Sequence, residues 1–328
     1  MATTEILPAT TDRLRSLYRT MTLVRQVEQA LGRLFADGEV PGFIHLSIGQ
    51  EAIAAGVASA LQPQDTLATT HRGHGHVLAR GMAVEGFFKE IMGRDGGLCR
   101  GRGGSMHVAD LSLGILGANG IVGAGIPIAL GSALAHQVRR TGGVAVTYFG
   151  DGAMAEGVLH ERLNLAALWK LPLLLVCENN GWSEFSPTAR QFAARLQALA
   201  GAFDIGFERV DGNDALAVAD AALAAAAALR AGHGPRVLEC MTHRVRGHFE
   251  GDAQKYRDAD ELKAGAERDP LARARAALLQ AGVAAADIDH DDAQAAARID
   301  AAITAARADA LPSFAAAIAD VYTTGEAA

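Results

Sequence analysis

Cysteine is scarce in this chain of 328 residues. Its three cysteines, Cys99, Cys177 and Cys240, are far apart and form no CxxC pair. A disulfide framework or a cysteine-based zinc site is therefore not expected, because both need several thiols at close spacing. Scattered free thiols are typical of a reducing compartment, so we expect a cytoplasmic protein.

Clustered positive charge and long apolar runs are also missing. The formal net charge of −7 argues against a nucleic-acid-binding surface and against binding to anionic membranes. The first residues contain no apolar signal core. Residues 121–138 lack acidic and strongly basic side chains. Their glycines and Pro127 nevertheless favour a closely packed helix that begins near Pro127 over a membrane span.

Strand and helix patterns alternate through the middle of the chain. Apolar residues at helical spacing predict an N-terminal helix, and short β-branched runs predict buried strands. Such alternation predicts an α/β fold with a mostly parallel sheet and helices on both faces. The predicted helices are 11–37, about 50–61, 153–169 and 214–231, and the predicted strands are 66–70, 144–149, 173–177, 207–210 and 236–241.

The ends of the chain differ from this central part. Residues 258–328 are rich in alanine, carry scattered acidic residues and show no strand pattern. We therefore expect an N-terminal helical segment over 1–40, an α/β domain over 41–257 and a helical C-terminal region over 258–328.

Glycine is concentrated in residues 93–126. A loop of this length inside a domain is uncommon unless it binds a ligand. A flexible linker is the alternative, but linkers are polar, and this segment contains Met, Ile, Leu and Val. The segment therefore favours a ligand-binding loop.

Gly150-Asp151-Gly152 directly follows a predicted strand and precedes a predicted helix. Glycines let the backbone approach a phosphate, and the helix N-terminus supplies unpaired N–H groups. An aspartate beside a diphosphate needs a cation between them, and Mg²⁺ prefers such oxygen ligands. Asn179 and Asn180 follow the next strand, whose end lies beside the first in a parallel pair. The alternative is two unrelated turns, but the combined spacing favours a diphosphate-and-magnesium site.

The segment 150–182 resembles the thiamine-diphosphate motif of E1 α subunits, which belong to pyruvate, branched-chain 2-oxo acid and acetoin dehydrogenase complexes. The resemblance spans roughly residues 20 to 270 and has several motifs in one order. These are FIHLSIGQEA (43–52), HRGHGH (71–76), GRGGSMHVAD (101–110), GANGIVGAGIP (117–127), GDGAMAEG (150–157) and HRVRGHFEGDAQKYR (243–257). The resemblance implies a thiamine-diphosphate-binding fold, with the cofactor supplying the carbanion chemistry.

The resemblance also implies roles for individual residues. Mg²⁺ would be held by Asp151, Asn180 and the Trp182 backbone oxygen, and the diphosphate end of the cofactor would contact Arg72, His71, Gly150, Asp151, Gly152 and Ala153. The aminopyrimidine end would meet Gly120 and the apolar wedge Val122. Protons near the thiazolium ring would be moved by His45 and by His248, which also contacts the cofactor. His74 would order the loop near the diphosphate.

Two expected features are missing from the sequence. Catalysis in this family needs a carboxylate against the aminopyrimidine, which a β subunit supplies in two-chain members. Glu51 is the nearest acidic residue, but its place early in a helix favours a capping role. We therefore expect an inactive single chain, an α2β2 heterotetramer with a β subunit, and an E2 lipoyl acyltransferase as acceptor. Phe249 stands where animal pyruvate members carry a phosphorylated serine, which excludes control at that residue.

The motifs define a reaction type more sharply than a substrate. GHFEGDAQKYR and NNGWSEFSP favour acetoin over pyruvate or a branched-chain 2-oxo acid. A carboxylate substrate would benefit from an extra pocket cation, but the sequence does not place Arg244 or Arg246. Two other classes stay open. A single-chain thiamine enzyme would need a second α/β domain, and a non-catalytic assembly subunit would not need the intact Asp151 and Asn180.

Overall fold

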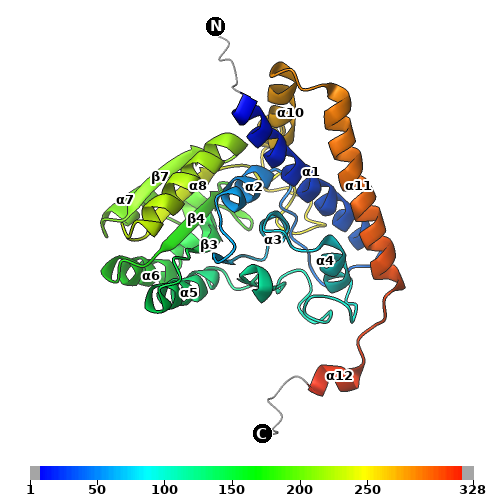
Figure 1. Cartoon of the computed structure of the whole chain (residues 1–328), viewed down its shortest axis with the longest axis horizontal. Helices are drawn as coiled ribbons and strands as arrows, with labels where there is room; N and C mark the ends of the chain where they lie inside the picture. Colours follow the sequence, from blue (N-terminus) through cyan, green and yellow to red (C-terminus); the bar gives the residue numbers. More distant parts are fainter. Residues whose placement is uncertain (1–7, 320–328) are drawn as a thin grey trace.

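A six-stranded parallel sheet forms the centre of the molecule (Figure 1). The computed structural model describes residues 8–319. The strand order is β2-β1-β3-β4-β8-β7, which confirms the predicted α/β fold. The strands are β1 (Thr66–Ala68), β2 (Ile115–Gly117), β3 (Ala145–Gly150), β4 (Leu173–Asn179), β7 (Gly206–Asp211) and β8 (Arg236–Met241).

Helices cover both faces of this sheet, because its buried strands are apolar on both sides. Val146 and Tyr148 of β3 face one core, while Ala145 and Phe149 face the other, as expected from the two-residue period of a strand. The first core contains residues of α1, α2, α3, α4, α8 and α11, and the second contains residues of α5, α6 and α7. The helices are α1 (Pro8–Ala36), α2 (Glu51–Ser59), α3 (His74–Ala79), α4 (Val84–Ile91), α5 (Gly125–Arg139), α6 (Gly157–Leu168), α7 (Leu196–Gly201), α8 (Ala215–Arg230), α9 (Ala259–Ala266), α10 (Pro270–Gln280), α11 (Ala285–Ala308) and α12 (Phe314–Ala319).

The strand order reverses direction between β1 and β3. From β1 the chain moves outward to β2, and it then returns to the other side of β1 to form β3. Parallel sheets bind ligands in the crevice at such a reversal, beyond the carboxyl ends of the strands. The β3–β4 register aligns Gly150 with Glu178, so the residues after each strand lie side by side, as predicted.

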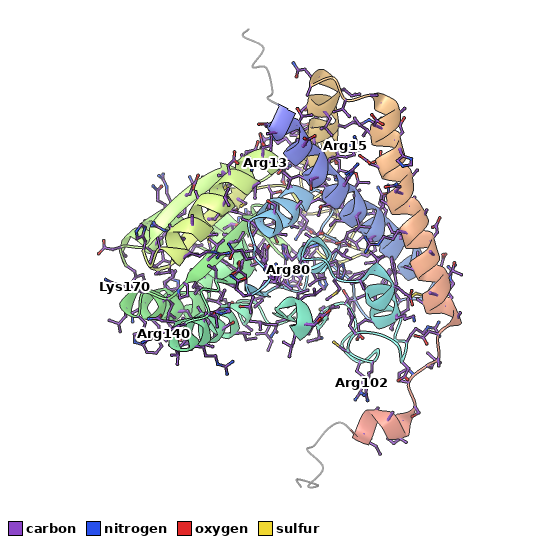
Figure 2. All side chains as sticks on the ribbon, viewed as in Figure 1. Arg13, Arg15, Arg80, Arg102, Arg140 and Lys170 are labelled. Atoms are coloured by element: carbon purple, nitrogen blue, oxygen red, sulfur yellow. The ribbon has the colours of Figure 1, made fainter. Side chains whose placement is uncertain are left out.

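The two helical ends of the chain pack against each other. Helices α10 and α11 lie alongside α1, and Arg15 of α1 lies at this junction (Figure 2). Arg15 Nε is 2.8 Å from Asp291 Oδ2, and the Tyr18 hydroxyl donates to Asp292. Both helical ends also share apolar cores with the sheet helices. The segment boundaries at residues 40 and 257 stay a prediction.

Three local expectations need correction or refinement. The predicted helix from Ala153 does not start directly: a 3₁₀ turn covers Asp151–Ala155, Glu156 is extended, and α6 begins at Gly157. The glycine-rich loop contains β2, which is only three residues long and pairs with β1. The packed helix near Pro127 is α5, but only one face is buried, since Ile128 is 44% exposed. No helix among the described residues could span a membrane.

Candidate active site

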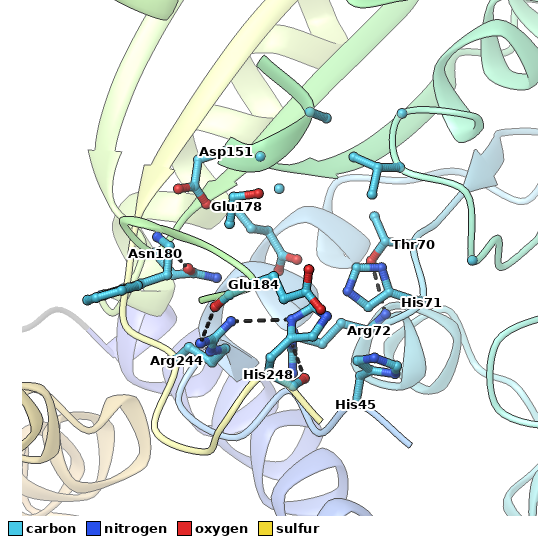
Figure 3. Close-up of a pocket in the computed structure, with 18 of the residues that line it drawn as sticks. His45, Thr70, His71, Arg72, Asp151, Glu178, Asn180, Glu184, Arg244 and His248 are labelled. Atoms are coloured by element: carbon cyan, nitrogen blue, oxygen red, sulfur yellow. Dashed lines mark hydrogen bonds between the residues drawn. The ribbon is translucent and has the colours of Figure 1, made fainter. Parts of the chain in front are cut away.

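One pocket lies at the carboxyl ends of the strands, where the strand order reverses (Figure 3). Its lining combines the loops after β1, β3, β4 and β8 with parts of the 38–50 loop and the glycine-rich loop. The structure brings every predicted site residue into this lining. They are His45, His71, Arg72, Gly120, Val122, Gly150, Asp151, Gly152, Ala153, Asn180, Trp182 and His248.

Asp151 is the most buried acidic residue among those that line the pocket. It is 1% exposed, and burial raises the pKa of its carboxyl to about 7. Thr188 Oγ1 donates to Oδ2, whereas Oδ1 has no hydrogen-bond partner among the described residues. A buried carboxylate oxygen without a partner is costly unless a cation satisfies it. The pocket therefore offers a ready oxygen ligand for a metal ion.

Asn180 and Trp182 line the same pocket as the Asp151 carboxylate. Asn180 Oδ1 accepts the Trp182 backbone N–H at 3.1 Å, and Asn180 Nδ2 donates to Gln50 Oε1 at 3.0 Å. Trp182 begins the small hairpin of β5 (Trp182–Ser183) and β6 (Ser186–Pro187). Its indole N–H donates to Glu261 Oε1 at 2.7 Å, which fixes the ring. This set of amide and carboxylate oxygens suits a hard divalent cation.

The glycines at the end of β3 leave room for a bound group. A Cβ at Gly152 would lie 2.5 Å from Ser183 Oγ, so a side chain cannot be added without moving the hairpin. A Cβ at Gly150 would meet no atom within 4 Å, so open space lies in front of that residue. Bare backbone at this position lets a phosphate approach the N–H groups closely. The residues present therefore fit a diphosphate bridged by a cation.

Arg72 is buried at the floor of the pocket. Its guanidinium donates to the Leu46 carbonyl at 2.6 Å and to the His248 carbonyl at 2.8 Å. Burial and the nearby Arg244 lower its pKa to about 10, which still leaves it charged at neutral pH. In this structure Arg72 joins the loops that carry the two predicted catalytic histidines.

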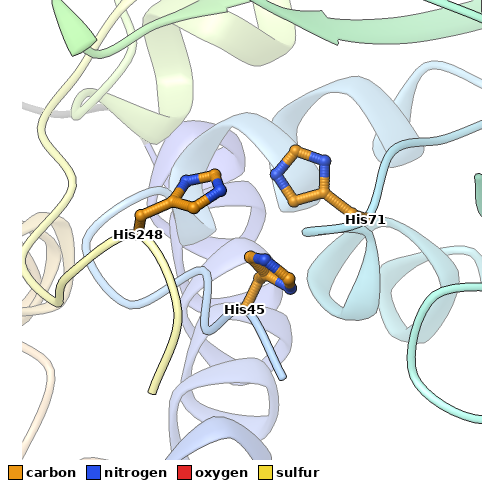
Figure 4. Close-up of side chains that lie close together, drawn as sticks. All are labelled: His45, His71 and His248. Carbon is orange, nitrogen blue, oxygen red and sulfur yellow. The ribbon is translucent and has the colours of Figure 1, made fainter. Parts of the chain in front are cut away.

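Three histidines meet at the side of the pocket that faces these loops (Figure 4). The ring centroids are 4.7 Å apart for His45 and His71, and 5.0 Å apart for His45 and His248. Burial, followed by the charge of Arg72, lowers the pKa of His45 to about 3 and that of His248 to about 4. Burial likewise lowers the pKa of His71 well below its usual range. All three rings are therefore neutral at pH 7, and without a bound anion they are weak proton acceptors.

Arg244 is the main site residue that the sequence did not place. It is 2% exposed, and its guanidinium donates to the Glu184 carbonyl and the Tyr256 hydroxyl. It also lies 3.4 Å from His248 Nδ1. Arg244 lies in the HRVRGH motif, but the motif forms an irregular loop, so its spacing of four residues from His248 did not predict their contact. Arg246, in contrast, is exposed and pairs with Glu250.

Other lining residues carried no usable sequence signal. Glu178 is the last residue but one of β4 and follows an apolar run, and its carboxylate is 3.0 Å from His76 Nε2. The remaining ones lie in loops or, for Ser183, in the short strand β5, and the sequence pattern does not predict their course. They are Gln50, Thr69, Thr70, Met106, Asn119, Ile121, Gly123, Ser183 and Glu184.

The glycine-rich loop reaches the pocket because two buried carboxylates hold it. Glu90 of α4 accepts backbone N–H groups from Cys99, Gly101, Gly103 and Gly104 at 2.6 to 3.0 Å. This arrangement fixes the loop just before Met106, which lines the pocket.

The second carboxylate acts through His74. Glu28 Oε2 lies 3.0 Å from His74 Nδ1, and His74 Nε2 lies 2.7 Å from Ser105 Oγ. His74 thus links α1 to the glycine-rich loop rather than lining the pocket. Glu51 has a structural role: it pairs with Arg25 and accepts the Gly49 N–H, and it is also absent from the lining.

The fold and the pocket define an α/β protein with a pocket at the strand ends whose residues fit a diphosphate. Residues 18–314 match the model of the family described as "Dehydrogenase E1 component". The chain therefore belongs to the dehydrogenase E1 component family.

Its relatives are α subunits of oxidoreductases. The chain is 47% identical over 260 residues, 78% of each chain, to the α subunit of acetoin:2,6-dichlorophenolindophenol oxidoreductase from Bacillus subtilis. It is 44% identical over 323 residues to the protein of the same name from Cupriavidus necator, covering 97% of this chain and 96% of the relative. It is also 42% identical over 280 residues to the pyruvate dehydrogenase E1 component subunit alpha of Zymomonas mobilis, covering 84% and 79%. The chain is accordingly an E1 α-type oxidoreductase subunit.

Proposed function

We propose that the chain is the α subunit of a thiamine-diphosphate-dependent E1 dehydrogenase that cleaves a C–C bond next to a carbonyl. Acetoin is the favoured substrate, and lipoamide on an E2 lipoyl acyltransferase is the acceptor. The observation that carries this proposal is the meeting of Asp151, Asn180 and the bare Gly150–Gly152 backbone at adjacent strand ends. The acetoin preference rests on the named activity of the two relatives from Bacillus and Cupriavidus.

Mg²⁺ would be held by Asp151, Asn180 and the Trp182 backbone oxygen. The unpartnered Oδ1 of Asp151 supports this assignment, because a cation there would restore the ionised carboxylate that burial disfavours. Gly150, Gly152 and Ala153 would face the diphosphate. Bound thiamine diphosphate would supply the carbanion that this chain's own side chains cannot form.

The aminopyrimidine end would lie toward Gly120 and Val122. Val122 is 47% exposed, so an apolar side chain stands at the mouth of the pocket. An apolar ring surface would cover it on binding, and burying that surface stabilises the complex. The neighbouring Ile121 is 73% exposed and extends this apolar rim.

The neutral histidines would handle substrate protons. Cleaving a hydroxy ketone requires the removal of a hydroxyl proton, which a neutral imidazole can accept once its pKa lies nearer to 7. A bound diphosphate would offset the charge of Arg72 and raise the pKa of both rings in that direction. His45 and His248 are the proposed catalytic groups, since both line the pocket with neutral rings. Arg72 and Asp252 hold the His248 loop: Arg72 donates to its carbonyl, and Asp252 accepts its backbone N–H at 2.7 Å.

The activating carboxylate would come from a β subunit in an α2β2 heterotetramer. Among the described residues, the pocket carboxylates are Asp151, Glu178 and Glu184. Asp151 is the proposed metal ligand and Glu178 is bound to His76. Glu184 is exposed, in the hairpin loop. None of them is both buried and free, so a partner chain would complete the site.

Pyruvate is the second candidate substrate. Arg244 lines the pocket as an extra buried cation, which favours a carboxylate substrate. Its terminal nitrogens already face Glu184, Tyr256 and His248, however. A neutral hydroxy ketone needs no ion pair with the Arg244 guanidinium, so acetoin remains the favoured substrate.

The decisive experiment compares the chain alone with the chain and its β subunit. Both preparations receive thiamine diphosphate and Mg²⁺, and acetoin, pyruvate and branched-chain 2-oxo acids are assayed with an artificial electron acceptor. We expect activity only in the pair, with acetoin fastest. Activity of the lone chain would rule out the two-subunit proposal. A faster reaction with pyruvate than with acetoin would show that pyruvate is the preferred substrate.

A residue-level test separates a catalytic from an assembly subunit. Asp151→Ala in the pair should abolish Mg²⁺-dependent binding of thiamine diphosphate, measured by calorimetry. The matched control is Asp260→Ala, because Asp260 is exposed on α9 and absent from the pocket lining. Unchanged cofactor binding in Asp151→Ala would refute the metal assignment, and an active pair with that variant would point to an assembly role.

A further inference from the structure

The imidazoles of His45, His71 and His248 form a cluster of potential metal ligands (Figure 4). They come from three separate segments: the loop before α2, the loop after β1 and the loop after β8. One ligand nitrogen of each ring lies within 4.8 Å of the corresponding nitrogens of the other two. A tetrahedral ion with Zn–N distances of about 2.0–2.1 Å needs nitrogens about 3.4 Å apart. Rotation of the half-buried His71 and His248 side chains can provide this closing movement.

The hydrogen bonding of these rings leaves donors for a metal. His45 is 8% exposed, and its Nδ1 has no hydrogen-bond partner among the residues described. The only ring bond recorded for the other two within residues 8–319 is the 3.4 Å contact between His248 Nδ1 and Arg244. A buried ring nitrogen without a partner is uncommon unless a ligand or water satisfies it. Neutral imidazole is also the form that coordinates metals.

We propose that His45, His71 and His248 bind a divalent transition-metal ion, with Zn²⁺ as the best fit. Three histidines with an open fourth position match the preferred coordination of Zn²⁺. The site differs in kind from the oxygen site at Asp151 and Asn180, which suits Mg²⁺. A metal ion on these nitrogens would remove their lone pairs from proton transfer and close this side of the pocket.

Nearby positive charge limits the affinity of the proposed site. The guanidinium groups of Arg72 and Arg244 both act on His45 and His248, and they oppose a second cation there. An anion or hydroxide in the fourth position would offset part of this repulsion. We therefore expect reversible binding that a chelator removes, rather than a permanent structural zinc site.

The test is a titration of the full chain with Zn²⁺ in the absence of cofactor, measured by calorimetry at pH 7.5. We expect one Zn²⁺ per chain. His71→Asn and His248→Asn should each weaken binding at least roughly tenfold. His233→Asn is the matched control, because His233 is exposed and outside the pocket lining. Asp151→Asn tests the neighbouring oxygen site and should leave Zn²⁺ binding unchanged.

A spectroscopic readout needs no variant and so does not depend on correct folding of one. Co²⁺ in the unmodified chain should give the intense visible absorption of a tetrahedral ion, and Zn²⁺ should abolish it by displacement. A pale octahedral spectrum, Zn²⁺ binding that survives in both histidine variants, or binding lost in Asp151→Asn would each overturn the proposal. Because the assay uses neither thiamine diphosphate nor substrate, its outcome is independent of the proposed function.

Discussion

His45 shows how a buried side chain couples the site to stability. Its ring is 8% exposed and lies among Arg72, Arg244 and two other histidines. Burial and those guanidinium groups keep it neutral far below the pH at which an exposed histidine is protonated. Folding therefore requires this imidazole to be uncharged, whereas the unfolded chain protonates it easily.

This difference predicts a pH-dependent stability. The unfolded pKa is near 6.5 and the folded value is about 3, so between these values the unfolded state binds more protons. The free energy of unfolding should thus fall on acidification below pH 6.5, with a slope of up to about 1.4 kcal/mol per pH unit for one such group. His45→Asn should reduce this slope in urea unfolding curves measured from pH 7 to pH 4.5. An equal slope in His45→Asn, or a reduced slope in the exposed-site variant His233→Asn, would contradict the assignment.

The sequence located the site residues better than it described their surroundings. Asp151 and Asn180 were predictable because parallel strands place their carboxyl ends together whatever the loops do. Thr188, which donates to Asp151, and Arg244 were not, since their positions depend on irregular loops without a repeating pattern. The catalytic and binding roles of the predicted residues stay predictions that the experiments above address.

At the scale of single elements, one carboxylate of helix α4 holds the glycine-rich loop in place. Glu90 accepts four backbone N–H groups of residues 99–104, and it is fully buried. A glycine-rich chain loses much entropy on ordering, so the loop needs this charged acceptor to hold one conformation. The same loop then carries Ser105 to His74 and Met106 to the pocket.

Glu90→Gln should therefore loosen this loop. The amide keeps one acceptor oxygen but turns an N–H₂ group toward the backbone donors, so we expect a loss of roughly 2–4 kcal/mol in the free energy of unfolding. Trypsin cleavage after Arg100 or Arg102 should also become faster. The control Glu85→Gln changes an exposed residue of the same helix that pairs with Lys89. Equal proteolysis of the two variants would show that Glu90 does not organise the loop.

Strand β2 illustrates what the element pattern could not predict. Its three residues, Ile115–Gly117, directly follow Gly114 inside a segment that resembles a continuous loop. Pairing with β1 rather than local propensity makes it a strand, because Leu67 N–H donates to the Gly114 carbonyl and Ile115 aligns with Leu67. Long apolar strands such as β3 and β4 were predictable because burial on both faces needs a continuous apolar run.

At the scale of the whole molecule, the C-terminal helices complete the core. Ile299, Ala302, Ile303 and Ala306 of α11 join the same apolar cluster as Val24 and Leu31 of α1 and the sheet residues. The sequence predicted helices at both ends, but it could not show that they meet, since α11 is alanine-rich and its apolar residues are widely spaced. The packing of α11 against both α4 and α1 makes those isoleucines part of the core.

This packing predicts a large effect of a substitution far from the pocket. Ile299 is 3% exposed, so Ile299→Ala should lower the free energy of unfolding by about 2–4 kcal/mol through lost burial and a cavity. Leu311→Ala, at a residue that is 70% exposed, should change it by less than about 0.5 kcal/mol. Chemical unfolding followed by circular dichroism measures both. Similar values for the two variants would mean that α11 is not part of the cooperative core.

The pairing of α1 with α11 also sets the order in which the chain can mature during synthesis. α1 is complete at Ala36, but α11 ends at Ala308. At roughly 5–20 residues per second, the part of α1 that packs on α11 stays uncovered for roughly 15–50 s after α1 has been made. The parts of α1 that contact α2 and α3 can be covered much sooner, because those helices follow directly in the chain.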